Sequence, residues 1–254
     1  MTDNEMTDVA HWESAWAVKP RMSFPTGIDV GTRNILDLLR GRLQPGMRFI
    51  EIGCAPGKTM VWASRITRRP VAGIDYSPSG VETSRWLAHG LGIQADIRCE
   101  DVCDTSFAAA SFDLVFSCGL IEHFEDPTPI LNAHVRLVAP GGMAVIGIPN
   151  YQGMYRRVQA WCDPQNLSIH NLRIMNLATL RTLAPTAPGL AVTAFAWGRF
   201  SPWIMSLPTR LGRTGTVLSW VLNFAAQLQP LQVDALCPLL VLEIRRPCAR
   251  PEAS

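Results

Sequence analysis

The stretch EIGCAPGKT at residues 51–59 ends the apolar run MRFIEI and opens a glycine-containing turn. Its last three letters match the end of a phosphate-binding P-loop, but that loop needs four residues between its first glycine and the Gly-Lys-Thr ending. Counting back places Ile52 where the first glycine should stand, and Gly53 is one residue too close. The spacing therefore excludes a P-loop, and no G-x-G-x-x-G dinucleotide pattern can be read here. What remains is an acidic residue followed by G-x-x-x-G.

Length and composition bound the fold class and the partners. A chain of 254 residues with 48% apolar composition can bury a full core, and it is most simply one α/β domain, 1–254, with additions. The formal net charge of +2 is too small for the basic footprint of a nucleic-acid-binding protein. We therefore expect no nucleic-acid partner.

The cysteines and the N-terminus indicate a reducing compartment. The seven cysteines are an odd number without a C-x-x-C pair, and no Cys/His cluster has zinc-finger spacing. The N-terminal MTDNEMTDVAHWES is acidic and polar, unlike a secretion signal, and no run of about 18 apolar residues is present. We expect a cytoplasmic protein with no bound metal and no transmembrane segment.

Short apolar runs rich in Val, Ile and Phe alternate with helix-length segments between residues 48 and 148. This alternation predicts βαβ units and a parallel sheet. The expected strands are 48–52, 71–75, 94–98, 113–118 and 143–148, with two late strands at 190–198 and 238–246. The expected helices are 28–42, 57–68, 78–90 and 127–138, the last stopping at the Pro-Gly-Gly of residues 140–142.

Acidic residues follow the second and third expected strands. Asp75, in VAGIDYSP, lies about 20 residues past the glycine turn, where dinucleotide folds place the acid that binds ribose hydroxyls. Asp101, in IRCEDVCD, ends the third strand, and Asp104 is the near alternative. Open α/β sheets bind ligands outside the carboxyl ends of their strands, so we expect the turn and these acids to share one site.

Two further motifs follow the three strand-end motifs already described. SFDLVFSCGLIEHFED (111–126) forms the fourth strand and its continuation, and RLVAPGG (136–142) follows the next helix. With EIGCAPG, VAGIDYSP and IRCEDVCD in this order over about residues 45–150, the chain resembles the class I, Rossmann-like methyltransferases that depend on S-adenosylmethionine (SAM). It is most similar to the ubiquinone/menaquinone-biosynthesis-like small-molecule methyltransferases, whose fourth strand likewise ends in a Glu-His pair. Ala55-Pro56 departs from the family's usual Gly-Thr or Gly-Ser, and Ala is small enough to leave the turn usable.

This resemblance implies the architecture. The family has a three-layer Rossmann-like fold, with a mostly parallel seven-stranded sheet and an antiparallel last strand. The late strands match its closing antiparallel pair. Residues 45–150 would be the SAM-binding core, 1–30 an N-terminal cap segment, and 151–190 and 198–237 substrate-side additions.

The resemblance also implies the cofactor, SAM, and the residues that bind it. Asp75 would hold the ribose hydroxyls and Asp101 the adenine amino group. The alternative for Glu51 or Asp75 is a helix cap or a pair with Arg. The full expected set is Glu51, Gly53, Cys54, Ala55, Gly57, Asp75, Tyr76, Asp101, Val102 and Ser117.

Histidines are the candidates for acid–base chemistry. A hydroxyl or protonated amine acceptor needs a base, and His titrates near neutrality. His123 stands just beyond the fourth strand, at the edge where the methyl group should point. His170, in LSIHNLRIMNLATLRTL, resembles a family position that faces the substrate. The sequence thus predicts His123 as the base and His170 as a second catalytic or substrate-contacting residue, with a structural role in shaping the pocket as the alternative for His123.

Motifs that are absent from the sequence exclude several classes of methyl acceptor. Lys19 and Lys58 are the only lysines, so the Lys-Asp-Lys-Glu set of RNA ribose methyltransferases cannot be built. The fourth strand is followed by Ser-Cys-Gly-Leu, which is neither the Asp/Asn-Pro-Pro-aromatic motif of amino-directed enzymes nor the Pro-Cys of cytosine-C5 enzymes. We expect methyl transfer to a hydroxyl oxygen or nitrogen of a small, apolar or aromatic molecule. The alternatives are a nucleic-acid or protein methyltransferase and a SAM-binding fold without turnover.

Segments outside the core are expected to set specificity. The 198–237 segment carries many aromatic and aliphatic side chains, including Phe200, Trp203 and Trp220. It predicts an apolar acceptor pocket, a sheet cover or a homodimer interface. Its stretch TVLSWVLNFAAQLQPL lacks the Lys/Arg-rich polar face of most membrane-surface helices.

Overall fold

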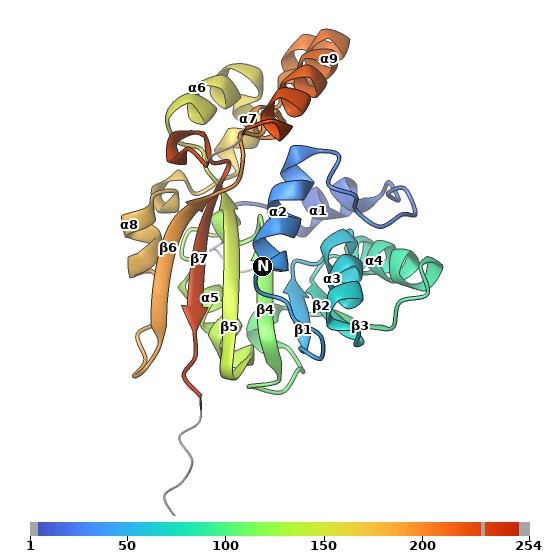
Figure 1. The fold of residues 1–254 in the computed structure, drawn as a ribbon, viewed down its shortest axis with the longest axis vertical. Coiled ribbons are helices and arrows are strands. Elements are labelled where there is room, and N and C mark those ends of the chain that lie inside the picture. The colour runs from blue at the N-terminus through green and yellow to red at the C-terminus, as the bar shows by residue number, and fades with distance from the viewer. Residues whose placement is uncertain (1–4, 230–231, 249–254) are drawn as a thin grey trace, which may run out of the picture.

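The computed structural model describes residues 5–229 and 232–248, which fold around one seven-stranded sheet (Figure 1). The strand order is β3-β2-β1-β4-β5-β7-β6, with β7 alone antiparallel to its neighbours. The strands are β1 Phe49–Ile52, β2 Val71–Asp75, β3 Ala95–Cys99, β4 Phe112–Cys118, β5 Val138–Pro149, β6 Ala191–Trp197 and β7 Leu239–Arg245. The predicted mostly parallel sheet with an antiparallel strand among the last two is confirmed.

Helices cover both faces of the sheet and its carboxyl edge. The α-helices are α1 Val9–Trp16, α2 Val30–Arg40, α3 Lys58–Thr67, α4 Pro78–Gly90, α5 Thr128–Leu137, α6 Gly153–Cys162, α7 Pro164–Ser168, α8 Leu177–Thr182 and α9 Leu207–Gln227. Short 3₁₀ turns are η1 Val102–Asp104, η2 Ile121–His123, η3 Leu172–Ile174, η4 Pro202–Met205 and η5 Asp234–Leu236.

Two buried clusters lie on opposite faces of the sheet, which gives the three-layer arrangement. Side chains of α2, α3 and α4, such as Leu38, Met60 and Leu87, pack on one face. Side chains of α5 and α8, such as Leu131 and Leu180, pack on the other. β1 and β2 are buried throughout, as expected for central parallel strands.

Local sequence signals explain where the core helices begin. The Asp29 side chain accepts from the Thr32 amide and starts α2, and the Ser77 hydroxyl accepts from Gly80 N to start α4. Pro78 follows directly, at a position where its missing N–H has no helical partner to lose. The four predicted core helices match the observed ones within two residues at each end.

β5 is longer than the sequence predicts. The Pro-Gly-Gly stretch was expected to lie in a loop before a strand at 143–148, but the chain is already extended from Val138, which pairs with Phe112. A register shift between Phe112 and Leu114 absorbs the irregular residues. Val138 and Met143 therefore both pair with β4, while the Pro-Gly-Gly residues between them bulge out of the ladder.

The additions gather at the carboxyl ends of the parallel strands, where α6, α7 and α9 lie above the sheet in Figure 1. α6, η4 and α9 share a small buried cluster that includes Tyr155, Met205 and Leu207. α9 changes direction at Gly212, whose backbone is non-helical. Within the described residues, no helix is long and apolar enough to cross a membrane.

Candidate active site

The turn after β1 is held tightly against β2. The amides of Gly53 and Cys54 both donate to the Ile74 carbonyl, at 2.8 and 3.0 Å. Gly53 and Gly57 have φ values of +67° and +85°, in the left-handed region that favours glycine. A Cβ on Gly57 would lie 3.1 Å from the Ser84 Cα, so this turn also requires a residue without a side chain. The G-x-x-x-G spacing is thus explained by backbone geometry and by contact with α4.

Glu51 lies beneath this turn. Its carboxyl group lies beside the Met60 backbone and the Thr59 side chain at the start of α3, and its Oε2 is buried without a hydrogen-bond partner among the described residues. Burial raises the pKa of Glu51 to about 8. Glu51 therefore lies buried between the turn and the start of α3.

Asp75 ends β2 and closes the turn from the other side. Its carboxylate accepts from Ala55 N at 3.1 Å and from Ser77 N at 3.0 Å, and its pKa is raised mainly by burial. A carboxylate offers about four lone-pair sites. Two are used by these amides, so Asp75 keeps capacity to accept from two further donors.

A cavity of about 520 Å³, here named the Asp75 cavity, opens beside these groups. Its walls are mostly apolar on the β4 and α5 side, with Asp126 the acidic exception, and carry Asp75, Glu100 and Asp101 on the β2 and β3 side. Its lining residues are Glu5, Ile52, Gly53, Ile74, Asp75, Tyr76, Glu100, Asp101, Val102, Cys103, Leu120, Phe124, Asp126, Pro129 and Ile130. This volume is within the range of small-molecule sites.

The structure divides the residues predicted to bind the cofactor. Gly53, Asp75, Tyr76, Asp101 and Val102 line the Asp75 cavity. The others do not line it; they are Glu51, Cys54, Ala55, Gly57 and Ser117. Ser117 instead contacts the His134 Nε2 at 2.9 Å. Direct contact of either set with a cofactor stays a prediction.

A smaller space of about 140 Å³, the Trp12 cavity, lies next to the first. It shares Gly53, Asp75 and Tyr76 with the Asp75 cavity and adds Ala55, Cys118 and His123. Trp12 and Trp16 of α1 form part of its wall.

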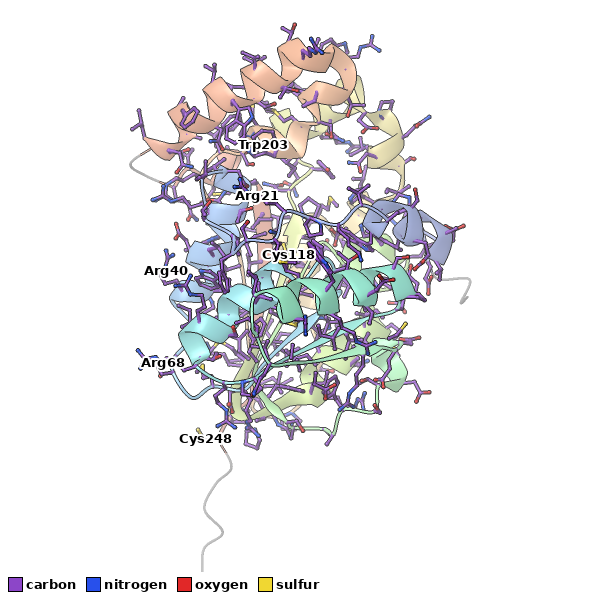
Figure 2. All side chains as sticks on the ribbon, turned by 90° about the vertical axis from the view of Figure 1, so that its right-hand side faces the viewer. Arg21, Arg40, Arg68, Cys118, Trp203 and Cys248 are labelled. Atoms are coloured by element: carbon purple, nitrogen blue, oxygen red, sulfur yellow. The ribbon has the colours of Figure 1, made fainter. Side chains whose placement is uncertain are left out.

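A third cavity of about 310 Å³, the His170 cavity, lies beyond the Trp12 cavity. The two share Cys118, Gly119 and His123. Figure 2 shows Cys118 near the centre of the molecule and Trp203 under α9. The lining residues are Gly31, Asn34, Ile35, Cys118, Gly119, Glu122, His123, Pro149, His170, Ser201, Trp203, Ile204, Pro238 and Leu239. Three adjoining cavities therefore run from Asp75 to Trp203, with His123 between the second and third.

His123 is buried and held in a fixed orientation. Its Nδ1 lies 3.1 Å from the Ile169 carbonyl, so Nδ1 carries the proton and Nε2 has a free lone pair. The ring contacts Trp12 edge-on at 5.0 Å and lies 4.6 Å from the His170 ring. Burial lowers the pKa of His123 to about 3. The ring is consequently neutral at physiological pH and a weaker base than an exposed histidine.

His170 and Glu122 complete the same cluster. The Nδ1 of His170 lies 2.6 Å from the Asn166 carbonyl, which again leaves Nε2 with the lone pair. Burial is the main cause that lowers the pKa of His170 and raises that of Glu122 to about 8. The predicted pair His123 and His170 is brought together by the fold, whereas Glu122 was not among the predicted site residues. Its signal was its place beside His123 in the Glu-His pair.

The N-terminal segment covers the cofactor side. Met6 N donates to the His123 carbonyl at 2.8 Å, and Glu13 of α1 accepts from the Ser77 hydroxyl and the Ser79 amide. Lys58 donates to the carbonyls of Arg21 and Ser23. Lys58, which belongs to the P-loop-like Gly-Lys-Thr sequence, therefore holds the chain that leads from α1 to α2 in place.

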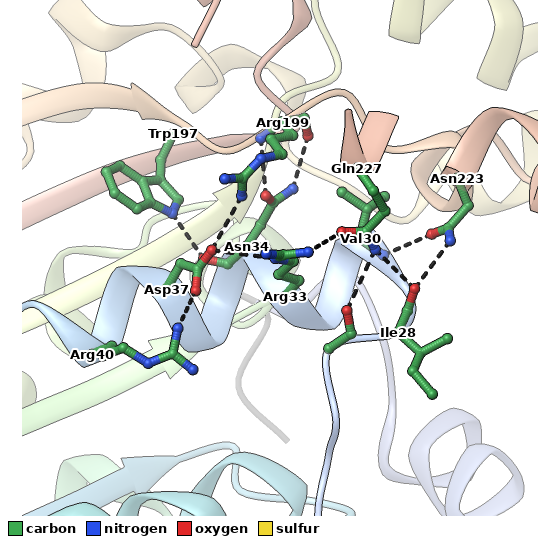
Figure 3. Close-up of polar contacts among 11 residues, drawn as sticks. Ile28, Val30, Arg33, Asn34, Asp37, Arg40, Trp197, Arg199, Asn223 and Gln227 are labelled. Atoms are coloured by element: carbon green, nitrogen blue, oxygen red, sulfur yellow. Dashed lines mark hydrogen bonds and ion pairs between the residues drawn. The ribbon is translucent and has the colours of Figure 1, made fainter. Parts of the chain in front are cut away.

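Polar side chains of α9 hold the start of α2 (Figure 3). Asn223 accepts from Val30 N at 2.7 Å and from the Trp203 Nε1 at 3.2 Å, and it donates to the Ile28 carbonyl at 3.0 Å. Gln227 also binds Arg33 and Ile28. These contacts join segments about 190 residues apart and fix two walls of the His170 cavity, α2 and η4.

Comparison with known protein families agrees with this geometry. The family model described as "Methyltransferase domain" matches residues 50–146, which contain the turn, Asp75, Asp101 and the Glu-His pair. This region is a class I SAM-dependent methyltransferase domain. Its cofactor is SAM.

Curated relatives match about half of this chain. The ubiquinone biosynthesis O-methyltransferase of Xanthomonas axonopodis pv. citri is 33% identical over 117 residues, 45% of this chain and 48% of the relative. The chain thus spans about half the length of the curated relatives it matches.

Solved structures share the fold of the methyltransferase domain and its surroundings. A Haemonchus contortus phosphoethanolamine N-methyltransferase 2 bound to SAM has a TM-score of 0.57 at 19% identity, covering 85% of this chain and 52% of that one. A geranyl diphosphate C-methyltransferase from Streptomyces coelicolor has a TM-score of 0.55 at 16% identity, covering 85% and 78%. Similar folds therefore methylate nitrogen and carbon, and the fold alone does not identify the acceptor atom.

The residues of the Asp75 cavity fit SAM. Asp75 retains lone pairs for ribose hydroxyls, and Val102, Leu120 and Ile130 provide apolar surface for a purine. A carboxylate oxygen of Glu5, Oε2, is buried without a hydrogen-bond partner among the described residues. An acidic wall is complementary to a cofactor that carries a sulfonium and an ammonium.

Proposed function

We propose that this protein transfers a methyl group from SAM to a hydroxyl group of a small, largely apolar acceptor bound in the His170 cavity. When bound, SAM supplies a methyl group already activated on a sulfonium, so the protein must mainly align the reacting atoms. The observation that carries the proposal is the sequence of three adjoining cavities, with His123 lining both the middle and the last.

The walls of the His170 cavity support an apolar or aromatic acceptor. Ile35, Trp203 and Leu239 offer apolar surface, whereas Glu122, His123 and His170 supply the titratable groups. A flat acceptor would lie with its apolar part against Trp203 and its hydroxyl toward the imidazoles. Such a division between apolar body and few polar groups is usual for small-molecule sites.

His123 is proposed to meet the acceptor hydroxyl through Nε2. Its Nδ1 is occupied by the Ile169 carbonyl, so Nε2 is the atom left to accept a proton or a hydrogen bond. This is the general-base role that the sequence predicts, and the low pKa makes the imidazole a weak base by itself.

A product assay with matched acceptors tests the proposal. The purified protein is incubated with SAM and either an alkyl-substituted catechol or the aniline of the same shape, and products are identified by mass spectrometry. We expect S-adenosylhomocysteine and a methyl ether from the catechol. If only the aniline gives a methylated product, the acceptor atom is nitrogen and not oxygen. Turnover only with protein or RNA fractions would overturn the small-molecule assignment, and SAM binding without turnover across a broad acceptor panel would favour a fold that only binds SAM.

A further inference from the structure

We infer that Glu122, His123 and His170 bind a divalent first-row transition cation that in turn binds the acceptor's oxygen. Each of these side chains offers one ligand atom, and the three atoms lie within 4.8 Å of one another. Their exposed fractions are 1%, 6% and 9%, so all three are buried, and all three line the His170 cavity. The cation site stands on this geometry, and its role in methyl transfer rests on the proposed function.

Both imidazoles are oriented as metal-binding histidines usually are. Such histidines donate the other ring N–H to a backbone carbonyl or carboxylate, which fixes the tautomer and the ring plane. Here the Nδ1 atoms face the carbonyls of Ile169 and Asn166, at 3.1 and 2.6 Å. Each ring therefore presents Nε2 as its free ligand atom. Tyr151 and Trp12 contact the two rings edge-on and restrict their rotation.

Glu122 supplies the anionic ligand. Its Oε2 is buried and has no hydrogen-bond partner among the residues that the structure describes. An unpaired buried carboxylate oxygen is costly and uncommon in folded proteins. The backbone around it is fixed, because the Glu122 carbonyl accepts from Asn171 N at 2.6 Å. The neighbouring imidazoles make a shared cation the simplest partner for this oxygen.

The ligand types select the class of cation. Two imidazole nitrogens with one carboxylate favour zinc, manganese, iron or cobalt, whereas magnesium and calcium prefer oxygen ligands. Three protein ligands leave coordination positions open, as in catalytic rather than structural sites. The open side faces the His170 cavity, which these three residues line.

The cation gives the reaction a second way to activate a hydroxyl. When the acceptor oxygen binds the cation, its O–H bond breaks more easily and the proton leaves to solvent. The oxygen then forms a bond to the methyl carbon as the bond between sulfur and methyl breaks, with its electron pair remaining on sulfur. His123 Nε2 would then act as a ligand and not as the proton acceptor, so the two roles exclude each other.

Direct binding measurements test the site without relying on activity. The full chain is stripped with a chelator and titrated with Zn²⁺ by calorimetry and with Co²⁺ by visible absorption. We expect one ion per chain and Co²⁺ bands typical of nitrogen and oxygen coordination, neither displaced by equimolar Mg²⁺. Wild-type protein that binds neither ion, or that exchanges Co²⁺ for equimolar Mg²⁺, would overturn the inference.

Two variants and one control assign the ligands. Glu122→Gln and His170→Ala should weaken Co²⁺ binding by more than about 100-fold, because even loss of an orienting partner costs about 10- to 100-fold. His89→Ala, at an exposed position in α4, should leave binding unchanged. Circular dichroism and thermal unfolding check that each variant folds. If either ligand variant binds Co²⁺ as the wild type does, the assignment is wrong. If Glu122→Gln is the only variant that folds, its Co²⁺ affinity alone tests the assignment.

Activity measured on the same samples separates the two proposals. Chelator-stripped protein should methylate the catechol at least about ten-fold more slowly than protein reloaded with the cation. Equal rates would overturn the activating role and leave the proposed methyl transfer intact. Cation binding without turnover of any acceptor would instead count against the proposed function.

Discussion

The two halves of the site are built in different ways. The Asp75 cavity is formed mainly by the ends of β1, β2, β3 and β4 and the turns that follow them, all within the methyltransferase domain. The His170 cavity draws its walls from α2, the end of β4, residue 149, His170, η4 and the start of β7. The first half follows from repeated βα units, whereas the second depends on how distant segments meet.

The two halves of the site should differ in how easily substitutions change what they bind. Ligand contacts made at strand ends are fixed by the sheet, so they resist change without loss of the fold. Contacts made by additions can change with those additions. We therefore expect substitutions in the two halves to affect different measurements, with SAM affinity responding to one half and acceptor turnover to the other.

The largest effect should come from His123→Ala. Loss of a positioned group that acts on the reacting hydroxyl typically costs about 100- to 10,000-fold in rate. We expect turnover of the catechol to fall on that scale while SAM affinity changes little, as measured by single-turnover assays and calorimetry. His89→Ala is the control. Turnover within a few-fold of wild type would make His123 a structural residue.

The second-largest effect should come from Asp75→Asn, which weakens the Asp75 cavity as a SAM site. The amide keeps one acceptor oxygen and loses the second, so one charge-assisted hydrogen bond worth about 1.5–3 kcal/mol disappears. SAM affinity should fall about 10- to 100-fold by calorimetry. The matched control is Asp96→Asn, because Asp96 is largely exposed on β3 and pairs with Arg98. Equal SAM affinity in both variants would remove Asp75 from the cofactor site.

A smaller effect is expected where α9 holds α2. Asn223→Ala removes three hydrogen bonds, to Val30 N, Trp203 Nε1 and the Ile28 carbonyl. The free energy of unfolding should fall by about 1.5–4.5 kcal/mol, since each of the three bonds contributes about 0.5–1.5 kcal/mol net. Chemical denaturation measures this, with the exposed Thr214→Ala on the same helix as the control. An unchanged midpoint would show that α9 contributes little to the position of α2.

The smallest effect is expected from Trp203→Phe. This change keeps an aromatic wall but removes the indole N–H bond to Asn223, worth about 1 kcal/mol. We expect the KM for the catechol to rise about five-fold, with SAM affinity unchanged. A rise in the KM for SAM instead of the acceptor would contradict the division of the site into two halves.

Much of the methyltransferase domain could be predicted because its signals are local. A glycine turn after a buried strand, an acid at the end of the next strand and a Ser-Pro helix start each act within a few residues of one another, so spacing alone places them. The same locality explains one error. The Pro-Gly-Gly sequence favours a turn and does leave the ladder, but β5 begins earlier than predicted because Val138, before it, already pairs with Phe112 of β4.

Periodicity and spacing along the chain were enough to place the strands and helices of the core in sequence, to exclude a P-loop and to locate Asp75 at the end of a strand. The folded structure was needed to show that Glu122, His123 and His170 meet, that Lys58 binds the chain before α2, and that Asn223 holds the start of α2. Contacts between residues about 35 to 190 positions apart depend on how whole elements pack on the sheet, so no local pattern records which surfaces will meet.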